Sequence, residues 1–262
     1  MSWKDKAKET KFQTEVKTSL FPRMYYHNGE KSRTGSGGTS GEWYTKASEL
    51  SAHGAVVNGH PWKPKEKFEG EHGWVATEMR LAPIMTRSQA FVVENDVTTW
   101  LKNYTAGARI YTEILCFVDG ISTPMIFCLK GMTAKAIVGK GGILQSFRKD
   151  ATVHSADVAM TPPWTFYVPM CAPLDKNGKP VFTDTGYKSF VTMPVAGGSQ
   201  PLNGPEDLDK LYVGDEMLAT GETIAEVHAA WKNERRGNTD SADTGESASA
   251  PRAGGSESEL PW

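Results

Sequence analysis

The chain is poor in cysteine and has no long apolar run, and each lack excludes a class of protein. The three cysteines, Cys116, Cys128 and Cys171, are odd in number and far apart, which argues against a disulfide framework and a CxxC metal clip. No window approaches the ~20 apolar residues of a membrane helix, so an integral membrane protein is excluded. The first six residues alternate in charge, where a signal peptide needs a basic and then an apolar stretch. We therefore expect a cytoplasmic protein.

Catalytic motifs are also lacking. The segment closest to a phosphate-binding loop is Gly139-Lys140-Gly141-Gly142, but a Walker motif needs Ser or Thr directly after its Gly-Lys pair. The six histidines form no HExxH pair, and no GxSxG occurs. A nuclease would need a cluster of metal-binding carboxylates, and Glu94 with Asp96 is a pair without a third ligand. The sequence thus predicts a protein that is not an enzyme and that holds no metal or cofactor.

The formal net charge is only −2, but it is unevenly distributed. Residues 237–262 carry −4, which leaves +2 for residues 1–236. The C-terminal stretch consists of Ser, Gly, Ala and acidic residues with almost nothing large to bury, so ordering it would cost entropy that packing does not offset. We expect a disordered acidic tail on a mildly basic body.

Residues that favour turns and loops divide the remainder of the chain into segments. Gly, Ser and Pro are frequent at residues 32–41 and 53–64, which predicts an irregular region over residues 1–70. Apolar residues at helical spacing predict one helix over residues 132–148, weakened by its glycines, and a surface helix over residues 222–234. β-Branched and aromatic runs predict strands at residues 74–79, 89–93, 109–118, 124–129, 164–171 and 187–193.

The order of these elements is about three strands, a helix and two further strands, with antiparallel turns. This is the element order of the OB-fold, a five-stranded Greek-key barrel with a helix between its third and fourth strands. We therefore expect a mainly β chain. An OB-fold-like barrel would occupy residues 71–236, between the irregular region at residues 1–70 and the tail at residues 237–262.

Aromatic and basic residues in the expected barrel indicate a binding surface. In the strand at residues 109–118, Tyr111, Glu113, Leu115 and Phe117 share one face, and the aliphatic opposite face is expected to be core. Exposed rings would form a platform on which bases stack at about 1–3 kcal/mol each, whereas a second layer of structure would bury them. Basic residues among aromatics suit a single strand, with ordinary solvated lysines as the alternative. The candidate nucleic-acid-binding residues are Tyr111, Phe117, Trp164, Tyr167, Trp62, Lys63, Lys65, Arg109, Lys130 and Lys140.

The chain ends in two carboxylates, an aliphatic residue, a proline and an aromatic residue. This ending resembles the C-terminal tip of bacterial and phage single-stranded-DNA-binding proteins, with Trp262 where Phe is usual and Leu260 where Ile is usual. In such a tip the aromatic residue enters a partner's hydrophobic pocket flanked by basic groups. The resemblance implies that the residues that bind replication or recombination proteins are Glu257, Glu259, Leu260, Pro261 and Trp262.

Together these features predict a protein that coats and protects single-stranded DNA by base stacking and phosphate contacts and recruits replication or recombination partners through its tip. The resemblance fits a phage or mobile-element origin. RNA in place of DNA stays open, and so does a homo-oligomer. The main alternative is a structural or assembly protein, such as a virion component, whose aromatic residues pack in subunit interfaces without binding nucleic acid.

Overall fold

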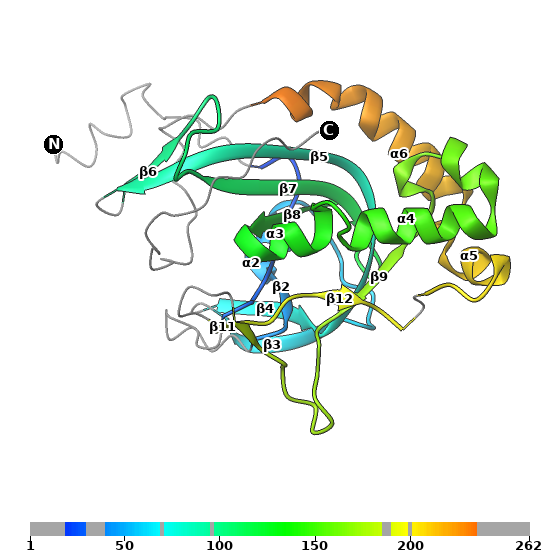
Figure 1. Cartoon of the computed structure of the whole chain (residues 1–262), viewed down its shortest axis with the longest axis horizontal. Helices are drawn as coiled ribbons and strands as arrows, with labels where there is room; N and C mark the ends of the chain where they lie inside the picture. Colours follow the sequence, from blue (N-terminus) through cyan, green and yellow to red (C-terminus); the bar gives the residue numbers. More distant parts are fainter. Residues whose placement is uncertain are drawn as a thin grey trace, which may run out of the picture.

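A computed structural model describes residues 19–29, 40–68, 71–94, 97–184, 190–198 and 201–234. The chain is mainly β, as the sequence predicts, and its main sheet is large and mixed (Figure 1). The strand order is β12-β9-β5-β7-β8-β1-β2-β4-β3, with β6 as a further partner of β5 and with β10 and β11 as a separate pair. The strands are β1 (Arg23–Tyr26), β2 (Trp43–Lys46), β3 (Lys63–Phe68), β4 (Glu71–Ala76), β5 (Glu78–Glu94), β6 (Val97–Trp100), β7 (Arg109–Val118), β8 (Met125–Lys130), β9 (Val168–Cys171), β10 (Thr183–Asp184), β11 (Phe190–Val191) and β12 (Val195–Ala196).

The meander β5–β7–β8 forms the centre of the sheet. β7 matches the strand expected at residues 109–118, and β8 pairs with it antiparallel, which confirms the expected hairpin. β5 is longer than expected: its 17 residues extend well beyond the strand expected at residues 89–93, which it contains. The strand expected at residues 74–79 is divided between β4 and β5. A register shift between Pro83 and Met85 lets β5 bend, so that one strand follows the curved sheet (Figure 1).

Between β8 and β9 the chain forms two helices, α3 (Gly131–Val138) and α4 (Ile143–His154). They are separated at Gly139 to Gly142, where the sequence predicts a weakened helix. Ile137 of α3 and Phe147 of α4 are buried in the main hydrophobic core. Figure 1 shows the sheet curving around α3, so this core lies on the concave side of the sheet.

The expectation that residues 1–70 are irregular is wrong for the part that the structure describes. β1, β2 and β3 belong to the main sheet, and α2 (Ala47–Ala52) follows β2. β1 pairs parallel with β8 and antiparallel with β2, so it joins the two halves of the sheet. Local composition did not indicate these strands because they are short and one of their neighbours, β8, is distant in the sequence.

The main sheet is not closed into a barrel. Its path ends at β12 on one side and at β3 on the other, and the register joins these two strands only to β9 and β4 among the described residues. The expected closed five-stranded barrel is therefore wrong. The N-terminal strands extend the sheet beyond β8, and that long-range pairing is absent from any local sequence pattern.

The C-terminal part differs from the expected strand and helix bounds. β9 covers only the end of the strand expected at residues 164–171, because Pro163–Thr165 forms a 3-10 turn, η2. β11 lies within the strand expected at residues 187–193, of which residues 187–189 lie outside the described residues. The helix expected at residues 222–234 begins earlier, as α6 (Asp215–Val227), and continues in a 3-10 turn, η3 (Ala229–Asn233). α5 (Pro205–Leu211) precedes it.

α6 and η3 cover part of the convex side of the sheet. Figure 1 shows α6 along the outer side of β5. Trp231 of η3 is 2% exposed and belongs to a second hydrophobic cluster with Leu115 and Phe117 of β7. The residues of β7 thus alternate between two buried clusters, as the sequence predicts for its two faces, but both faces are covered.

Candidate nucleic-acid interface

The convex face of the sheet brings basic and aromatic side chains together from β5, β7 and β8. Residues directly opposite each other in an antiparallel pair project to the same face. The register pairs Tyr111 with Lys130 and Arg87 with Glu113. The Nζ of Lys130 lies over the Tyr111 ring, 5.7 Å from its centroid. Arg109 precedes Tyr111 by two residues in β7 and therefore faces the same side.

β1, β2 and β3 continue this surface. Tyr25 pairs with Tyr44, and their rings stack with centroids 5.2 Å apart. The His27 ring also stacks on the Tyr44 ring, with the two centroids 4.4 Å apart. Through β4, the register places Lys63 and Lys65 on the same side. We call this surface the aromatic–basic face, and its residues are Arg23, Tyr25, His27, Tyr44, Lys46, Lys63, Lys65, Arg87, Arg109, Tyr111 and Lys130.

Arg23 lies at the centre of the aromatic–basic face. Burial alone would lower the pKa of its guanidinium, but the neighbouring acidic groups of Cys128, Tyr25, Tyr111 and Glu113 raise it above the usual arginine value. Arg23 therefore stays charged. Within the described residues, its buried Nε has no hydrogen-bond partner. Arginine can match phosphate geometry with several N–H groups, but this Nε lies beneath the surface, so a phosphate contact would have to use the guanidinium's other N–H groups.

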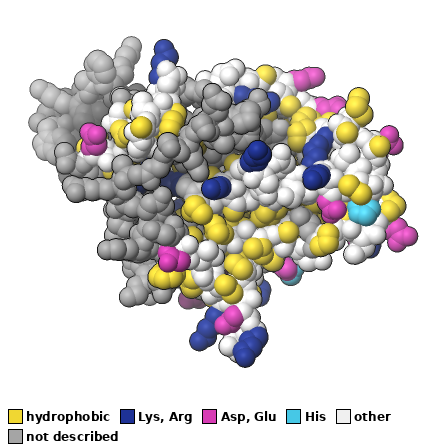
Figure 2. Space-filling view, in the orientation of Figure 1, with side chains coloured by type: hydrophobic (Ala, Val, Ile, Leu, Met, Phe, Trp, Pro, Cys, Tyr) yellow, Lys and Arg dark blue, Asp and Glu magenta, His cyan; other side chains and the backbone are white. Residues whose placement is uncertain are grey.

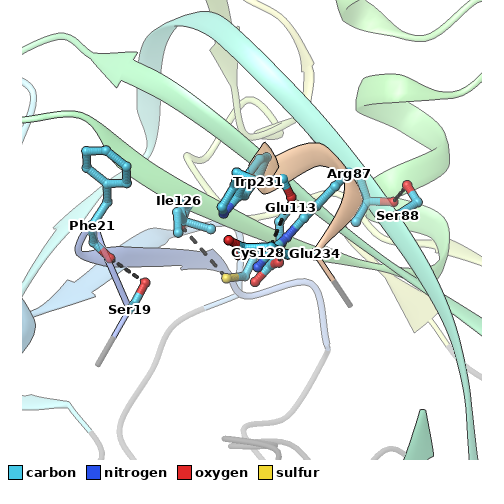
Figure 3. Close-up of polar contacts among 10 residues, drawn as sticks. Ser19, Phe21, Arg87, Ser88, Glu113, Ile126, Cys128, Trp231 and Glu234 are labelled. Atoms are coloured by element: carbon cyan, nitrogen blue, oxygen red, sulfur yellow. Dashed lines mark hydrogen bonds and ion pairs between the residues drawn. The ribbon is translucent and has the colours of Figure 1, made fainter. Parts of the chain in front are cut away.

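Arg87 and Glu113 form a buried ion pair on this face (Figure 3). The Nε of Arg87 donates to Oε2 of Glu113 at 2.6 Å, and the two side chains are only 15% and 3% exposed. The guanidinium lies 4.2 Å from the centroid of the Trp231 ring. Its Nη1 donates to the Trp231 carbonyl at 3.2 Å and to the Glu234 carboxylate at 3.3 Å. One arginine thus joins β5, β7 and the C-terminal turn.

Several predicted residues come together here. Phe117 and Trp164 lie in the apolar cluster on the same side of the sheet, under α6, and Tyr167 packs against that cluster. Lys65 pairs with the Glu42 carboxylate at 2.6 Å, whereas Lys63 is exposed. The predicted residues that lie on the aromatic–basic face itself are Tyr111, Lys63, Lys65, Arg109 and Lys130.

Two predicted residues lie elsewhere. Trp62 is 3% exposed in the main core, and its Nε1 donates to the carbonyl of Asp119 at 3.1 Å. Lys140 is exposed in the turn between α3 and α4, on the concave side. Figure 2 shows Lys and Arg side chains gathered along these two helices. Lys135 and Lys149 are the exposed lysines of α3 and α4, so Lys140 belongs to a separate basic surface.

The predicted rings do not present their faces to solvent. Tyr111, Phe117 and Trp164 are 6%, 3% and 8% exposed. The Nε1 of Trp164 donates to the carbonyl of Leu218 in α6 at 3.1 Å, and burial raises the pKa of Tyr167 to about 12. α6 is therefore the second layer that the sequence left as the alternative to an exposed platform. Bases can stack on Phe117 or Trp164 only if α6 moves away.

Sequence reasoning missed the contribution of β1 and β2. Arg23, Tyr25 and His27 alternate along β1, so that they share one face, and Tyr44 and Lys46 alternate in β2. This alternation was a usable signal, but each run is only four to five residues long and lies beside Gly- and Ser-rich sequence. The predicted tip residues, Glu257 to Trp262, lie outside the described residues.

The basic side chains of the aromatic–basic face are chemically suited to contact an anion. The described residues contain no group of three or more His, Cys, Asp or Glu side chains suited to hold a metal ion. No helix in the described ranges has the length and apolar character needed to cross a membrane. Comparison of the chain with protein-family models, with curated proteins and with solved structures finds no match.

Proposed function

We propose that this chain binds single-stranded nucleic acid, and single-stranded DNA in particular, through the aromatic–basic face. One observation carries the proposal: basic side chains from β1, β2, β3, β5, β7 and β8 lie on one side of the sheet among stacked aromatic rings. They outnumber the carboxylates of Glu42, Glu113 and Glu234 that lie beside them. A cationic surface tracks a phosphate backbone, and aromatic rings accept unpaired bases.

The span of the face fits a single strand of several nucleotides. From β5 to β3 the sheet is seven strands wide, and at about 4.8 Å between strands this gives roughly 29 Å. Because the rings of Tyr44 and Tyr111 are nearly buried, we expect phosphate contacts to supply most of the affinity. The meander β5–β7–β8, the helices after it and the return of β9 to β5 also support an OB-like unit within the larger open sheet.

The first test measures affinity for a fluorescent oligothymidine as the salt concentration rises. We expect log K to fall linearly with log salt, by about 0.7 for each neutralised phosphate, and we expect weaker binding to a matched duplex. The variant Lys63→Glu/Arg109→Glu/Lys130→Glu should lose at least about tenfold in affinity, because it reverses three charges of the aromatic–basic face.

The matched control for this test reverses three lysines on the other basic surface, in the variant Lys135→Glu/Lys140→Glu/Lys149→Glu. Both variants change the net charge equally, so a general charge effect would weaken both. Equal losses in the two variants, or an affinity that does not change with salt, would contradict the proposal. Thermal melting followed by circular dichroism verifies that both variants are folded. Failure to bind any oligonucleotide would favour an assembly protein.

We also propose that the tail recruits other proteins through Glu257, Glu259, Leu260, Pro261 and Trp262. A chain that stops at Gly237 should bind oligothymidine at least as tightly as the full chain, because it lacks −4 of charge that competes with phosphate. Fluorescence titration of the two proteins at low salt measures this. Weaker binding by the shortened chain would show that the tail contributes to the interface instead.

A further inference from the structure

Arg87 forms ion pairs with two carboxylates, one in the sheet and one at the end of the turn η3. One guanidinium serves two carboxylates: Glu113 is 3% exposed, whereas Glu234 is 56% exposed. Glu113 also interacts electrostatically with Arg23, so within the sheet this carboxylate lies beside two guanidinium groups. Glu234, which directly follows η3, adds a second carboxylate from outside the sheet, on the side of Arg87 that η3 covers (Figure 3).

The turn η3 is held to the sheet less firmly than α6, whose partly buried Met217, Leu218 and Ile224 pack against the second hydrophobic cluster. Within α6 only Gly221 is buried, and a Cβ at that position would lie 2.3 Å from Nε1 of Trp164, so the helix rests closely on the indole. Trp231 is the buried anchor of η3, and its ring lies against the Arg87 guanidinium. A short turn with a single buried side chain, such as η3, opens at a lower free energy than the whole domain unfolds.

The two groups that cover Arg87, a carboxylate and an aromatic ring, resemble the phosphate and the base of a nucleotide. The planar guanidinium forms the same paired N–H contacts with a carboxylate as with a phosphate, and it stacks on flat rings. The carboxylate of Glu234 is an anion within hydrogen-bond distance of Nη1, and Trp231 supplies the stacked ring. A phosphate and a base of a bound strand would satisfy the same donors and the same face of Arg87.

We infer that Arg87 is a phosphate-binding subsite of the aromatic–basic face that η3 occludes, and that a bound strand displaces η3 to reach it. This inference rests on the proposed function. The ligand is the phosphodiester backbone of a single strand, which replaces Glu234, while Glu113 keeps the guanidinium in place.

The variant Glu234→Gln tests the occlusion. Without the second carboxylate, the affinity for oligothymidine should rise about two- to fivefold, as expected for the loss of a partly exposed ion pair. The matched control is Glu222→Gln, which makes the same charge change at an exposed position of α6. An increase that is equal in both variants would reflect net charge alone and would overturn the inference.

Limited proteolysis gives an independent measurement of displacement. Trypsin cuts after Lys232, an exposed residue of η3, and mass spectrometry identifies the product. Because cleavage requires the turn to leave the sheet, Glu234→Gln should be cut faster than the wild type or Glu222→Gln without any ligand. Cutting at wild-type rate in Glu234→Gln would overturn the inference, even if its affinity were raised.

The measurements distinguish failure of the occlusion by η3 from failure of the proposed nucleic-acid binding. If the wild type binds oligothymidine and neither measurement distinguishes Glu234→Gln from Glu222→Gln, the occlusion is wrong and the proposed function stands. If neither the wild type nor Glu234→Gln binds any oligonucleotide, the proposed function fails and the subsite fails with it. Binding by Glu234→Gln alone would support both.

Discussion

Removal of the Glu113 carboxylate is expected to lower the free energy of unfolding by about 3–5 kcal/mol. The substitution Glu113→Ala leaves the Arg87 guanidinium, 15% exposed, without its 2.6 Å partner in the layer between β5, β7 and Trp231. An uncompensated buried charge costs more than the pair itself contributes. Glu234 offsets only a small part of this cost, because it is 56% exposed and screened by solvent. Urea denaturation followed by circular dichroism measures the loss.

The control for this prediction replaces both partners, in Arg87→Met/Glu113→Leu. Apolar residues of similar volume remove both charges, so most of the lost stability should return. If Glu113→Ala costs less than about 1 kcal/mol, Arg87 reaches solvent in the variant and the buried pair does not stabilise the fold. If the double variant is as unstable as the single one, the loss comes from packing and not from charge.

The second large effect is expected at Trp43. Its side chain is 0% exposed, and its ring lies 4.8 Å from that of Tyr26, with the two strands paired at this point. Trp43→Ala should cost about 3–5 kcal/mol, because a cavity of indole size cannot close between a sheet and its core. Chemical denaturation measures the change, and Trp43→Phe should cost distinctly less, since it keeps most of the apolar volume.

This substitution also tests whether residues 19–68 belong to the same cooperative unit as the remainder of the sheet. β1 and β2 share the main core with β5, β7 and β8, so Trp43→Ala should lower the midpoint of a single transition. Two separate transitions, with only the first shifted, would mean that the N-terminal strands unfold alone. The expected boundary at residue 70 would then separate two units that unfold independently, although the strands on both sides of it belong to one sheet.

The parts of the fold that the sequence predicted correctly depend on local signals. β7 is a ten-residue run of β-branched and aromatic residues, and the break between α3 and α4 follows from adjacent glycines. The parts it missed depend on long-range pairing. β1 is identified as a strand only through β8 and β2, and barrel closure depends on which strands end the sheet.

The candidate site shows the same division. Alternation in β7 was enough to place Tyr111, Glu113 and Phe117 on one face. It could not show that α6 and η3 bury Phe117 and Trp164, because a covering helix more than fifty residues away leaves no mark on the strand's own pattern. Lys140 was grouped with the binding residues because it lies near them in sequence, whereas the sheet separates it from them in space.

The parallel pairing of β1 with β8 also has a consequence for how the chain is made. During synthesis β1 leaves the ribosome first, but its neighbour β8 emerges far later along the chain. At about 5–20 residues per second, this leaves the first strand exposed for on the order of ten seconds. The edge of β1 that faces β8 must therefore stay unpaired, or be covered by a chaperone, until the hairpin β7–β8 has been translated.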